Sequence, residues 1–401
     1  MLLSVDMHSW QCCTCPIPAS FRGLGGRALA VALATEGNYV DSNGEPCLVL
    51  APGLLAASCR EASVRCAVAS CLPGRTGVAL SSAGGSAASA LVRCGLRAVL
   101  LHGVGRKGGL CDIIIDASGG HLVPVTDMGP AVQVNTAGIM ANLSAQWPEA
   151  ACIICAGQLG RLGVAIAGTT FSDASLRPCS HAGGGSGMVL GLAGIRAIVI
   201  ARTAPRQSTK FSGHIGRAFT EALQAYGSRT GVSCTMRCAT CPHGEGASGR
   251  NSRKWPGFEH VWASGDEGAD AVVVARYVAL CDGMQVDAFA LAVRLEELVT
   301  QKLLPAGDTD RVLAELESLT RQPETSWLLP QLQGWMPERR PKVSQQRVLL
   351  DTLGLCRFAM SALDEDCRVR ALLESLVTAE TGGDAVTLDD WMQRILILEN
   401  P

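Results

Sequence analysis

The sequence predicts an α+β protein: a β-rich domain over residues 1–205, then two smaller helical domains, 206–305 and 306–401. Three observations support this fold class. Short apolar segments alternate with glycine-rich turns in the first half of the chain. The Pro-, Ser- and Arg/Lys-containing stretch RTAPRQSTKFSGH (202–214) then interrupts the pattern. Beyond it, apolar residues recur every three or four positions, which is typical of amphipathic helices.

The expected strands of the first domain are apolar runs bounded by turn residues. They are CLVLAPG (47–53), GVALSSAGG (77–85), AVLLHGVG (98–105), CDIIIDASGG (111–120), GVAIAGTTF (163–171) and AIVIART (197–203). A helix, SAASALVRCG (86–95), is expected to lie across them.

The expected helices of the other domains cover residues 287–304, 309–320 and 387–398. In the last of them, Thr387 and Asp390 have the spacing of a capping box, in which each side chain satisfies a backbone N–H of the first turn.

Charge and hydropathy exclude two classes of partner. Charged residues make up 17% of the chain and the net charge is −2, so the sequence predicts neither nucleic-acid nor anionic-membrane binding. The N-terminal stretch carries Asp6 and lacks the basic start of a signal peptide. The most apolar window, GMVLGLAGIRAIVIA, is short and contains Arg196, so we expect no membrane span and a cytoplasmic protein.

The chain contains 18 cysteines, most of them in apolar runs where a reduced thiol packs as a small hydrophobic group. Two clusters stand apart. We expect QCCTCPIP, with Cys12, Cys13 and Cys15, to be a surface loop, because it has no fourth Cys or His nearby.

The second cluster, CTMRCATCPHGEG, spaces Cys234, Cys238 and Cys241 as C-x3-C-x2-C. Three thiolates at this spacing can bind three irons of a [4Fe–4S] cluster, which needs a fourth partner. An iron left open for a small molecule would indicate a radical S-adenosylmethionine enzyme. A distant cysteine as fourth ligand would indicate an electron relay in another enzyme.

An internal repeat relates DGMQVDAFAL (282–291) to DTLGLCRFAM (351–360). We expect each copy to open a helix after an Asp-led turn, so that Asp282 and Asp351, each at a helix N-terminus, present equivalent carboxylates to a two-fold symmetric ligand. Two ordinary N-caps are the alternative, because Asp favours that position. The second copy has Cys356 where the first has Asp287, which makes Cys356 a candidate fourth cluster ligand.

In the order in which they occur, several segments together resemble the aldehyde ferredoxin oxidoreductase family, tungsten enzymes with two pterin dithiolenes beside a [4Fe–4S] cluster. The similarity covers nearly the whole chain. The segments are FRGLGGRALAVALA, PCLVLAPGLL, SSAGGSAASALVRCGLRAVLLHG, HAGGGSGMVLGLAGIRAIVI, CDGMQVD, DTLGLC and TAETGGDAVTLDDWMQRILILEN.

The resemblance implies a pterin-binding first domain. Close backbone approach to two pterins would fall to glycines, whose N–H groups would be offered to the pterin phosphates. The implied cofactor-binding residues are Gly84, Gly85, Gly183, Gly185, Gly187, Asp282, Asp287 and Asp351.

The resemblance also implies metals and partners. Tungsten or molybdenum would be held by the two pterins, with magnesium as an optional further cofactor. Cys234, Cys238, Cys241 and Cys356 would bind the cluster, and Glu259 of WPGFEH would move a proton near the metal. A small aldehyde or related carbonyl compound would be the substrate, and ferredoxin or another electron carrier the acceptor. The chain would act as a homo-oligomer or as a subunit of a larger complex.

Departures from the family pattern keep other functions open. The family's C-x2-C-x3-C motif has Glu245 at its third position here, so either Cys234 substitutes, or Glu245 is a ligand, or the cluster is altered. Gly184 stands where the family usually has Arg, and no His follows His260. A catalytically degenerate subunit or scaffold is therefore one alternative. A radical S-adenosylmethionine enzyme is the other, although that class places its motif early in a barrel.

Overall fold

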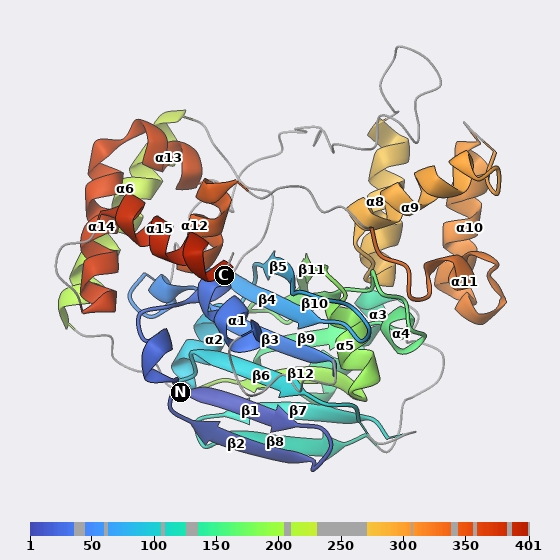
Figure 1. Cartoon of the computed structure of the whole chain (residues 1–401), viewed down its shortest axis with the longest axis horizontal. Helices are drawn as coiled ribbons and strands as arrows, with labels where there is room; N and C mark the ends of the chain where they lie inside the picture. The colour runs from blue at the N-terminus through green and yellow to red at the C-terminus, as the bar shows by residue number, and fades with distance from the viewer. Residues whose placement is uncertain are drawn as a thin grey trace.

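The computed structural model describes the chain except for ten internal segments and the two C-terminal residues. The described ranges are 1–35, 45–59, 63–105, 109–125, 135–203, 210–230, 271–305, 308–337, 344–355, 359–382 and 387–399. The expected fold class is confirmed: a domain with two β-sheets is followed by helical regions (Figure 1).

Two six-stranded sheets form the first domain. The first contains β1 (Leu2–Asp6), β2 (Gln11–Cys15), β3 (Cys47–Pro52), β4 (Cys66–Cys71), β5 (Ala79–Ala83) and β6 (Ala98–His102). The second contains β7 (Cys111–Asp116), β8 (Gly119–Pro124), β9 (Ala150–Ala156), β10 (Thr169–Ser172), β11 (Pro178–Ala182) and β12 (Ile195–Ala201). The helices of this domain are α1 (Gly26–Thr35), α2 (Ala87–Arg93), α3 (Thr136–Gln146), α4 (Gln158–Arg161) and α5 (Ser186–Leu192).

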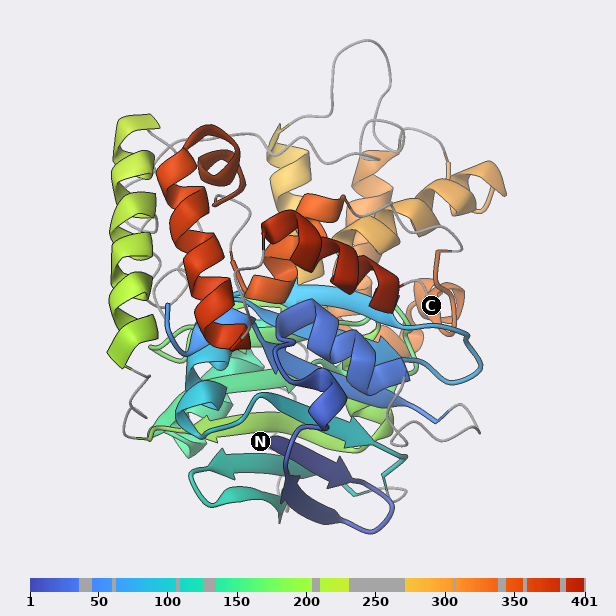
Figure 2. The same ribbon diagram turned by 60° about the vertical axis from the view of Figure 1, so that its left-hand side comes forward.

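The sheets are buried on both faces, which explains why their central strands are apolar throughout. In β3, Leu48 and Leu50 point into the core shared by the two sheets, while Val49 and Ala51 point to the outer core under α1. This alternation is the period of two expected of a strand. Helices α2 and α5 contact strands of both sheets and so lie between them, whereas α1 and α3 pack on the outer faces. The domain is therefore layered as helix, sheet, helices, sheet, helix (Figure 2).

The two halves of this domain repeat one topology. The strand order β2-β1-β6-β3-β4-β5 matches β8-β7-β12-β9-β10-β11, and β1 pairs with β6 in parallel as β7 does with β12. Corresponding edge strands touch, β2 against β8 and β5 against β11. The sequence repeats as well: AGG at 83–85 returns at 182–184, and Arg97 at Arg196. We infer a tandem duplication related by a pseudo-two-fold axis.

The remaining helices form two groups by contact. Helix α6 (Lys210–Thr230) packs with α12 (Gln345–Leu353), α13 (Ala359–Glu365), α14 (Cys367–Thr381) and α15 (Leu388–Glu399). The other group is α8 (Ala271–Met284), α9 (Ala288–Thr300), α10 (Thr309–Arg321) and α11 (Leu328–Leu332). Thr387 caps α15 as expected, with the Asp390 N–H donating to Thr387 Oγ1 at 3.1 Å, and the Thr387 hydroxyl donates in turn to Asp390 Oδ2 at 2.7 Å. This grouping crosses the division expected at residue 305, which stays an expectation from the sequence.

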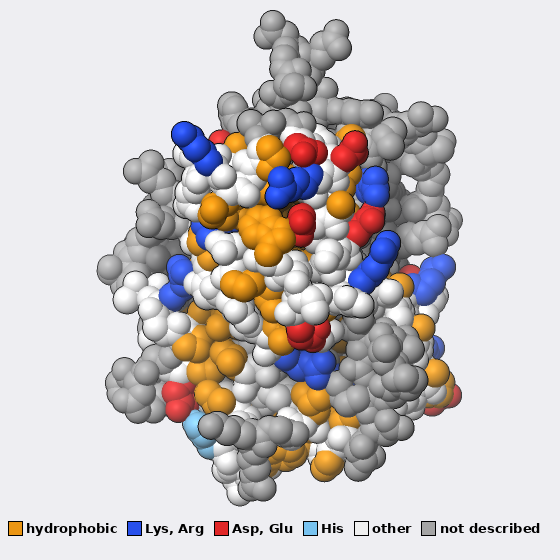
Figure 3. Space-filling view, turned by 90° about the vertical axis from the view of Figure 1, so that its right-hand side faces the viewer, with side chains coloured by type: hydrophobic (Ala, Val, Ile, Leu, Met, Phe, Trp, Pro, Cys, Tyr) orange, Lys and Arg blue, Asp and Glu red, His pale blue; other side chains and the backbone are white. Residues whose placement is uncertain are grey.

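The surface agrees with the low net charge. Over the second helical group, Figure 3 shows acidic and basic side chains interspersed with apolar ones. Trp335 illustrates the pattern: its Nε1–H donates to Glu297 Oε2 at 2.9 Å, and the Arg294 guanidinium stacks 5.3 Å from its ring. Among the helices that the structure describes, none combines the length and the apolar character that a membrane span requires.

Candidate functional site

The repeated Asp-led segments form two loops with the same backbone geometry. We name residues 282–287 the Asp282 loop and residues 351–355 the Asp351 loop. The Val286 N–H donates to Cys281 O at 3.0 Å, and the Leu355 N–H donates to Leu350 O at 2.8 Å. The residue before each donor is left-handed, with φ +57° at Gln285 and +80° at Gly354. The internal repeat seen in the sequence is therefore also a structural repeat.

The orientation expected for the two carboxylates is wrong. Asp282 lies in the last turn of α8 and Asp351 in the last turn of α12, not at helix N-termini. The left-handed residue that follows each Asp ends its helix, as at a C-cap. The N-cap role falls instead to Asp287, whose side chain accepts from the N–H groups of Phe289 and Ala290, both at 3.1 Å.

Each loop docks on a different half of the sheet domain. The Asp351 loop pairs with the first half through a bridge between Leu355 and Ser63, and the Arg65 N–H donates to Gly354 O at 3.0 Å. The approach is close enough that a Cβ on Gly53 would lie 2.2 Å from Gly354 Cα.

The Asp282 loop repeats this arrangement on the second half. Val286 bridges to Ala167, and the Gly168 N–H donates to Gln285 O at 2.6 Å. Gly157, which follows β9 as Gly53 follows β3, also lies close to its loop, since its Cβ would lie 2.9 Å from Gln285 Oε1, the end of a flexible side chain. The duplication of the sheet domain thus supplies two equivalent docking surfaces for two equivalent loops.

Between the docking surfaces, β5 and β11 exchange a symmetric pair of hydrogen bonds. The Gly84 N–H donates to Ser180 Oγ and the Gly183 N–H donates to Ser81 Oγ, each at 3.0 Å. Because Ser81 and Gly84 occupy the positions of Ser180 and Gly183 in the other half, the pseudo-two-fold axis passes between these bonds. In Figure 1 this point lies between the two helical groups.

The two carboxylates have different surroundings. The side chain of Asp351 is 7% exposed and its Oδ2 accepts from Arg347 Nε at 3.0 Å, one helical turn earlier. The side chain of Asp282 is 55% exposed, and its Oδ1 lies 3.6 Å from His181 Nε2. Burial lowers the pKa of His181, and the charge of Asp282 opposes that effect.

Comparison with known proteins agrees with this architecture. Residues 2–202, half of the chain, match the family model described as aldehyde ferredoxin oxidoreductase, N-terminal domain. The chain belongs to the aldehyde ferredoxin oxidoreductase family. No curated protein matches it.

A solved structure shares the fold. It is a chain of the active-site complex BamBC of benzoyl coenzyme A reductase, in complex with 1,5-dienoyl-CoA. The TM-score is 0.61 at 15% sequence identity, over 82% of this chain and 61% of the other. The present chain therefore spans about three-fifths of the length of the structure that it matches. At this identity the likeness concerns the fold alone.

The pterins of the aldehyde ferredoxin oxidoreductase family fit the loops better than they fit the glycine amides. Two like loops on two like halves suit a ligand with two like parts. The N–H groups of Gly84 and Gly183 already donate to serines, and that of Gly187 donates to Ala167 O at 3.0 Å. These three amides therefore already have acceptors within the protein, and their role toward phosphates stays a prediction.

The close approach expected of the glycines is present, but against the protein itself. A Cβ on Gly85 would lie 2.6 Å from Ser172 O, one on Gly185 2.8 Å from Ala165 O, and one on Gly183 2.2 Å from Asp287 Oδ2. That these glycines also line a cofactor site stays a prediction.

The expected metal ligands cannot be placed, because Cys234, Cys238, Cys241 and Cys356 lie outside the described residues, as do Glu245 and Glu259. Among the residues that the structure does describe, no three His, Cys, Asp or Glu side chains gather into a group that could hold a metal ion.

The N-terminal cysteine cluster differs from its expectation. Residues 11–15 form strand β2, not a loop, and pair with β1. Cys13 is exposed, as expected of a surface segment, and burial raises the pKa of Cys12 to about 11. The thiols of β2 are therefore part of a sheet edge.

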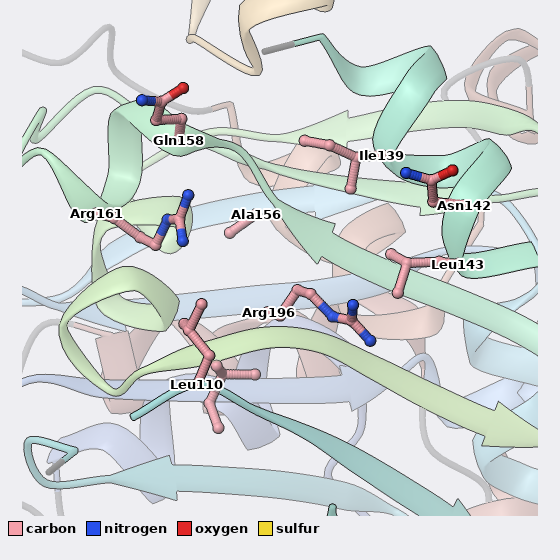
Figure 4. A pocket seen from close by; sticks show the side chains of 9 residues that line it. Leu110, Ile139, Asn142, Leu143, Ala156, Gln158, Arg161 and Arg196 are labelled. Carbon is pink, nitrogen blue, oxygen red and sulfur yellow. The ribbon is translucent and has the colours of Figure 1, made fainter. Parts of the chain in front are cut away.

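Two concave regions are present among the described residues, of which the second adjoins the Asp351 loop through Leu349 and Leu350. One is a small cleft of about 40 Å³, far too small for a pterin, and Figure 4 shows its side chains, which come from α3, α4 and nearby strands. The other, of about 340 Å³, has a floor of Leu349, Leu350, Leu363 and Leu388. Neither contains a residue that the sequence predicted for the site.

Sequence reasoning missed the partners of the Asp-led loops. His181, Thr170, Arg65 and Arg347 all lie at or beside them, but none belongs to the repeat that identified the loops. The available signal was the second repeat, AGG at 83–85 and 182–184, which marks the duplicated halves on which the loops dock.

Proposed function

We propose that this chain is an oxidoreductase that oxidises an aldehyde or related carbonyl compound at a tungsten or molybdenum bis-pterin centre in the cytoplasm. Electrons would leave through a [4Fe–4S] cluster held by Cys234, Cys238, Cys241 and Cys356 to ferredoxin or another carrier, with magnesium as an optional cofactor. Membership of a family of oxidoreductases supports the reaction class.

One observation carries the proposal: two geometrically equivalent Asp-led loops dock on the two equivalent halves of a duplicated sheet domain. A single-lobed ligand would need only one such surface. A ligand built of two like parts would use both, with one part held at each loop.

In this reaction the carbonyl carbon gains an oxygen from water, and two electrons and two protons leave. The metal centre supplies the redox chemistry when it is bound. The chain would supply the rest: Asp282 and Asp351 would accept hydrogen bonds from the amino groups of the pterins, and Glu259 would move a proton near the substrate. Asp287, which caps α9 beside Gly183, would hold the Asp282 loop in place.

Metal and pterin analysis tests the proposal. Protein made anaerobically in a host that synthesises the cofactor should contain iron, sulfide, pterin and a group 6 metal. Asp282→Ala and Asp351→Ala should each lose pterin while the protein stays folded by circular dichroism. Asp308→Ala is the matched control, since Asp308 caps α10 away from the loops. Full pterin content in both loop variants would show that Asp282 and Asp351 do not bind the cofactor.

A second candidate function, a catalytically degenerate subunit or scaffold, is favoured by specific observations. Gly84, Gly183 and Gly187 use their N–H groups within the protein, and Asp351 is already paired with Arg347. The matched chain is longer, and it comes from a complex, BamBC. A preparation with neither iron nor a group 6 metal would favour this function over oxidation.

The radical S-adenosylmethionine alternative loses its structural basis. That class requires a barrel of alternating strands and helices, whereas the described first domain is two stacked six-stranded sheets. Iron near four per chain without pterin or group 6 metal would be the analytical result that reopens it.

A further inference from the structure

His181 links the buried sheet to the Asp282 loop. It lies on β11, and its Nδ1 is 2.8 Å from Thr170 Oγ1 on the neighbouring strand β10. Thr170 is fully buried. The other ring nitrogen, Nε2, faces Asp282 Oδ1 at 3.6 Å across the gap between β11 and the end of α8. The imidazole is therefore hydrogen-bonded to a buried hydroxyl on one side, and on the other it lies at ion-pair distance, longer than a hydrogen bond, from a half-exposed carboxylate.

The chemistry of the hydroxyl, the imidazole and the carboxylate determines which of them donates and which accepts. An ionised carboxylate only accepts hydrogen bonds, so in the neutral ring the hydrogen is assigned to Nε2, which faces Asp282. Nδ1 then accepts from the Thr170 hydroxyl. If the ring gains a proton, the hydroxyl can rotate and accept from Nδ1–H. The hydrogen bond to Thr170 is therefore kept in both protonation states.

The corresponding position in the first half of the domain is occupied differently. His181 pairs with Thr170 as Ser82 pairs with Ala67, so Ser82 is its counterpart. Ser82 Oγ accepts from Arg65 Nε at 2.8 Å, and the Arg65 backbone contacts the Asp351 loop. The first half thus places a permanent cation beside its loop, whereas the second half places a group that can gain or lose charge.

We propose that His181 is a positioning residue that holds Asp282 Oδ1, so that the other carboxylate oxygen can accept hydrogen bonds from the amino and ring N–H groups of the ligand of the second half. This inference rests on the proposed function, because it gives that half-site a ligand with N–H donors such as a pterin edge. His181 acts through Asp282 and does not itself contact the ligand.

The coupling can be measured on the full chain without cofactor. The chain has seven histidines, so ring signals can be followed by NMR and that of His181 assigned with His181→Gln. Among the described charged groups, Asp282 at the end of α8 faces the ring, and Asp287 follows later in the same loop as the N-cap of α9. Asp282→Asn should lower the pKa of His181 further, because it removes the opposing negative charge. Asp308→Asn should leave the titration unchanged. An unchanged titration in Asp282→Asn would overturn the proposal.

Pterin content then tests the positioning role. His181→Ala should retain about five-fold less pterin than wild type after desalting, the effect of losing about one polar contact with Asp282. His181→Gln should restore most of it, because its amide nitrogen can reach the position of Nε2 and donate to Asp282. His121→Gln, at an exposed histidine of β8, is the matched control.

The outcomes separate this inference from the proposed function. If the wild-type protein contains no pterin, the proposed function fails, and the NMR titration alone decides whether His181 and Asp282 are coupled. If wild type contains pterin and His181→Ala retains all of it, the positioning role is refuted. If His181→Gln loses as much as His181→Ala while both variants fold normally, ring packing and not the polar contact with Asp282 explains the loss, which also refutes the positioning role.

Discussion

Adding one methyl group at Gly183 should uncap helix α9. An ideal Cβ at Gly183 would lie 2.2 Å from Asp287 Oδ2 and 3.0 Å from its Cγ. Gly183 is not among the glycines with positive φ, so alanine fits its backbone and the conflict is with the carboxylate. Because a carboxylate ends a short side chain, Gly183→Ala should displace it and leave the sheet intact.

The cost follows from what the carboxylate does. Asp287 Oδ1 accepts from two backbone N–H groups of the first turn of α9, those of Phe289 and Ala290. Losing an N-cap of this type costs about 1 kcal/mol, within a range of roughly 0.5–2 kcal/mol. If the first turn opens locally, about 1 kcal/mol corresponds to about five-fold faster amide exchange at these two residues.

Hydrogen exchange in a double-mutant cycle is the assay. Gly183→Ala and Asp287→Ala should each speed exchange at Phe289 and Ala290, and the double variant should be no faster than Asp287→Ala alone. Gly283→Ala is the control, because a Cβ there has no atom within 4 Å. Additive effects, or normal exchange in Gly183→Ala, would show that the methyl group and the cap do not compete.

Three further predictions concern the loops. Gly53→Ala should lower the free energy of unfolding, measured by urea titration, by about 1–3 kcal/mol or more, because its Cβ would meet the backbone of Gly354. Arg347→Ala should cost about 1–3 kcal/mol, since it leaves the buried carboxylate of Asp351 unpaired. Asp351→Ala should lower the free energy of unfolding less than Arg347→Ala does, because the half-exposed guanidinium of Arg347 stays solvated. A larger loss in Asp351→Ala than in Arg347→Ala would contradict the burial assigned to the two side chains. Thermal stability should fall as pH drops through about 6.5, because the lowered pKa of His181 means that the unfolded chain binds more protons there, and His181→Gln should flatten that slope.

The strands that are buried on both faces could be predicted, because they appear in the sequence as uninterrupted apolar runs. The run CLVLAPG became β3 and AIVIART became part of β12, because a strand between two apolar layers has no polar positions. The duplication was harder to see. The two halves share the path of the backbone and a few residues, such as Gly95 and Gly194, which are both left-handed. Most of their side chains differ.

The pair of loops could be predicted from the sequence, but the end of the helix at which each Asp lies could not. Asp is common at N-caps, so Asp282 and Asp351 were assigned to helix starts. Gly354, three residues after Asp351, was the available signal that a helix ends there. The first loop gives no such signal, because Gln285 takes the same left-handed conformation at φ +57° without being glycine.

Contacts between the loops and the sheet could not be predicted, since they join residues far apart in the chain. The Ser63 hydroxyl donates to Leu353 O at 2.8 Å, a bond that spans nearly 300 residues of sequence. The same holds for Thr136 Oγ1, which donates to Asp282 O at 2.6 Å. The two bonds lie at different places in the two halves, Ser63 just before β4 and Thr136 at the start of α3, so the duplication does not predict them either.

Comparing the two halves shows which features of the half-sites are sterically required and which can differ. Each loop has a glycine opposite it, but the constraint is stricter in the first half, because a Cβ on Gly53 would meet the backbone of Gly354 whereas a Cβ on Gly157 would mainly displace the Gln285 side chain. The charged neighbours carry no such steric requirement, and there the halves differ: Arg65 lies beside one loop and His181 beside the other. A ligand with two like parts would therefore meet one backbone geometry twice but two electrostatic environments, of which only the one at His181 changes with pH. On this argument, acid should alter the hold on one part of the ligand before it alters the hold on the other.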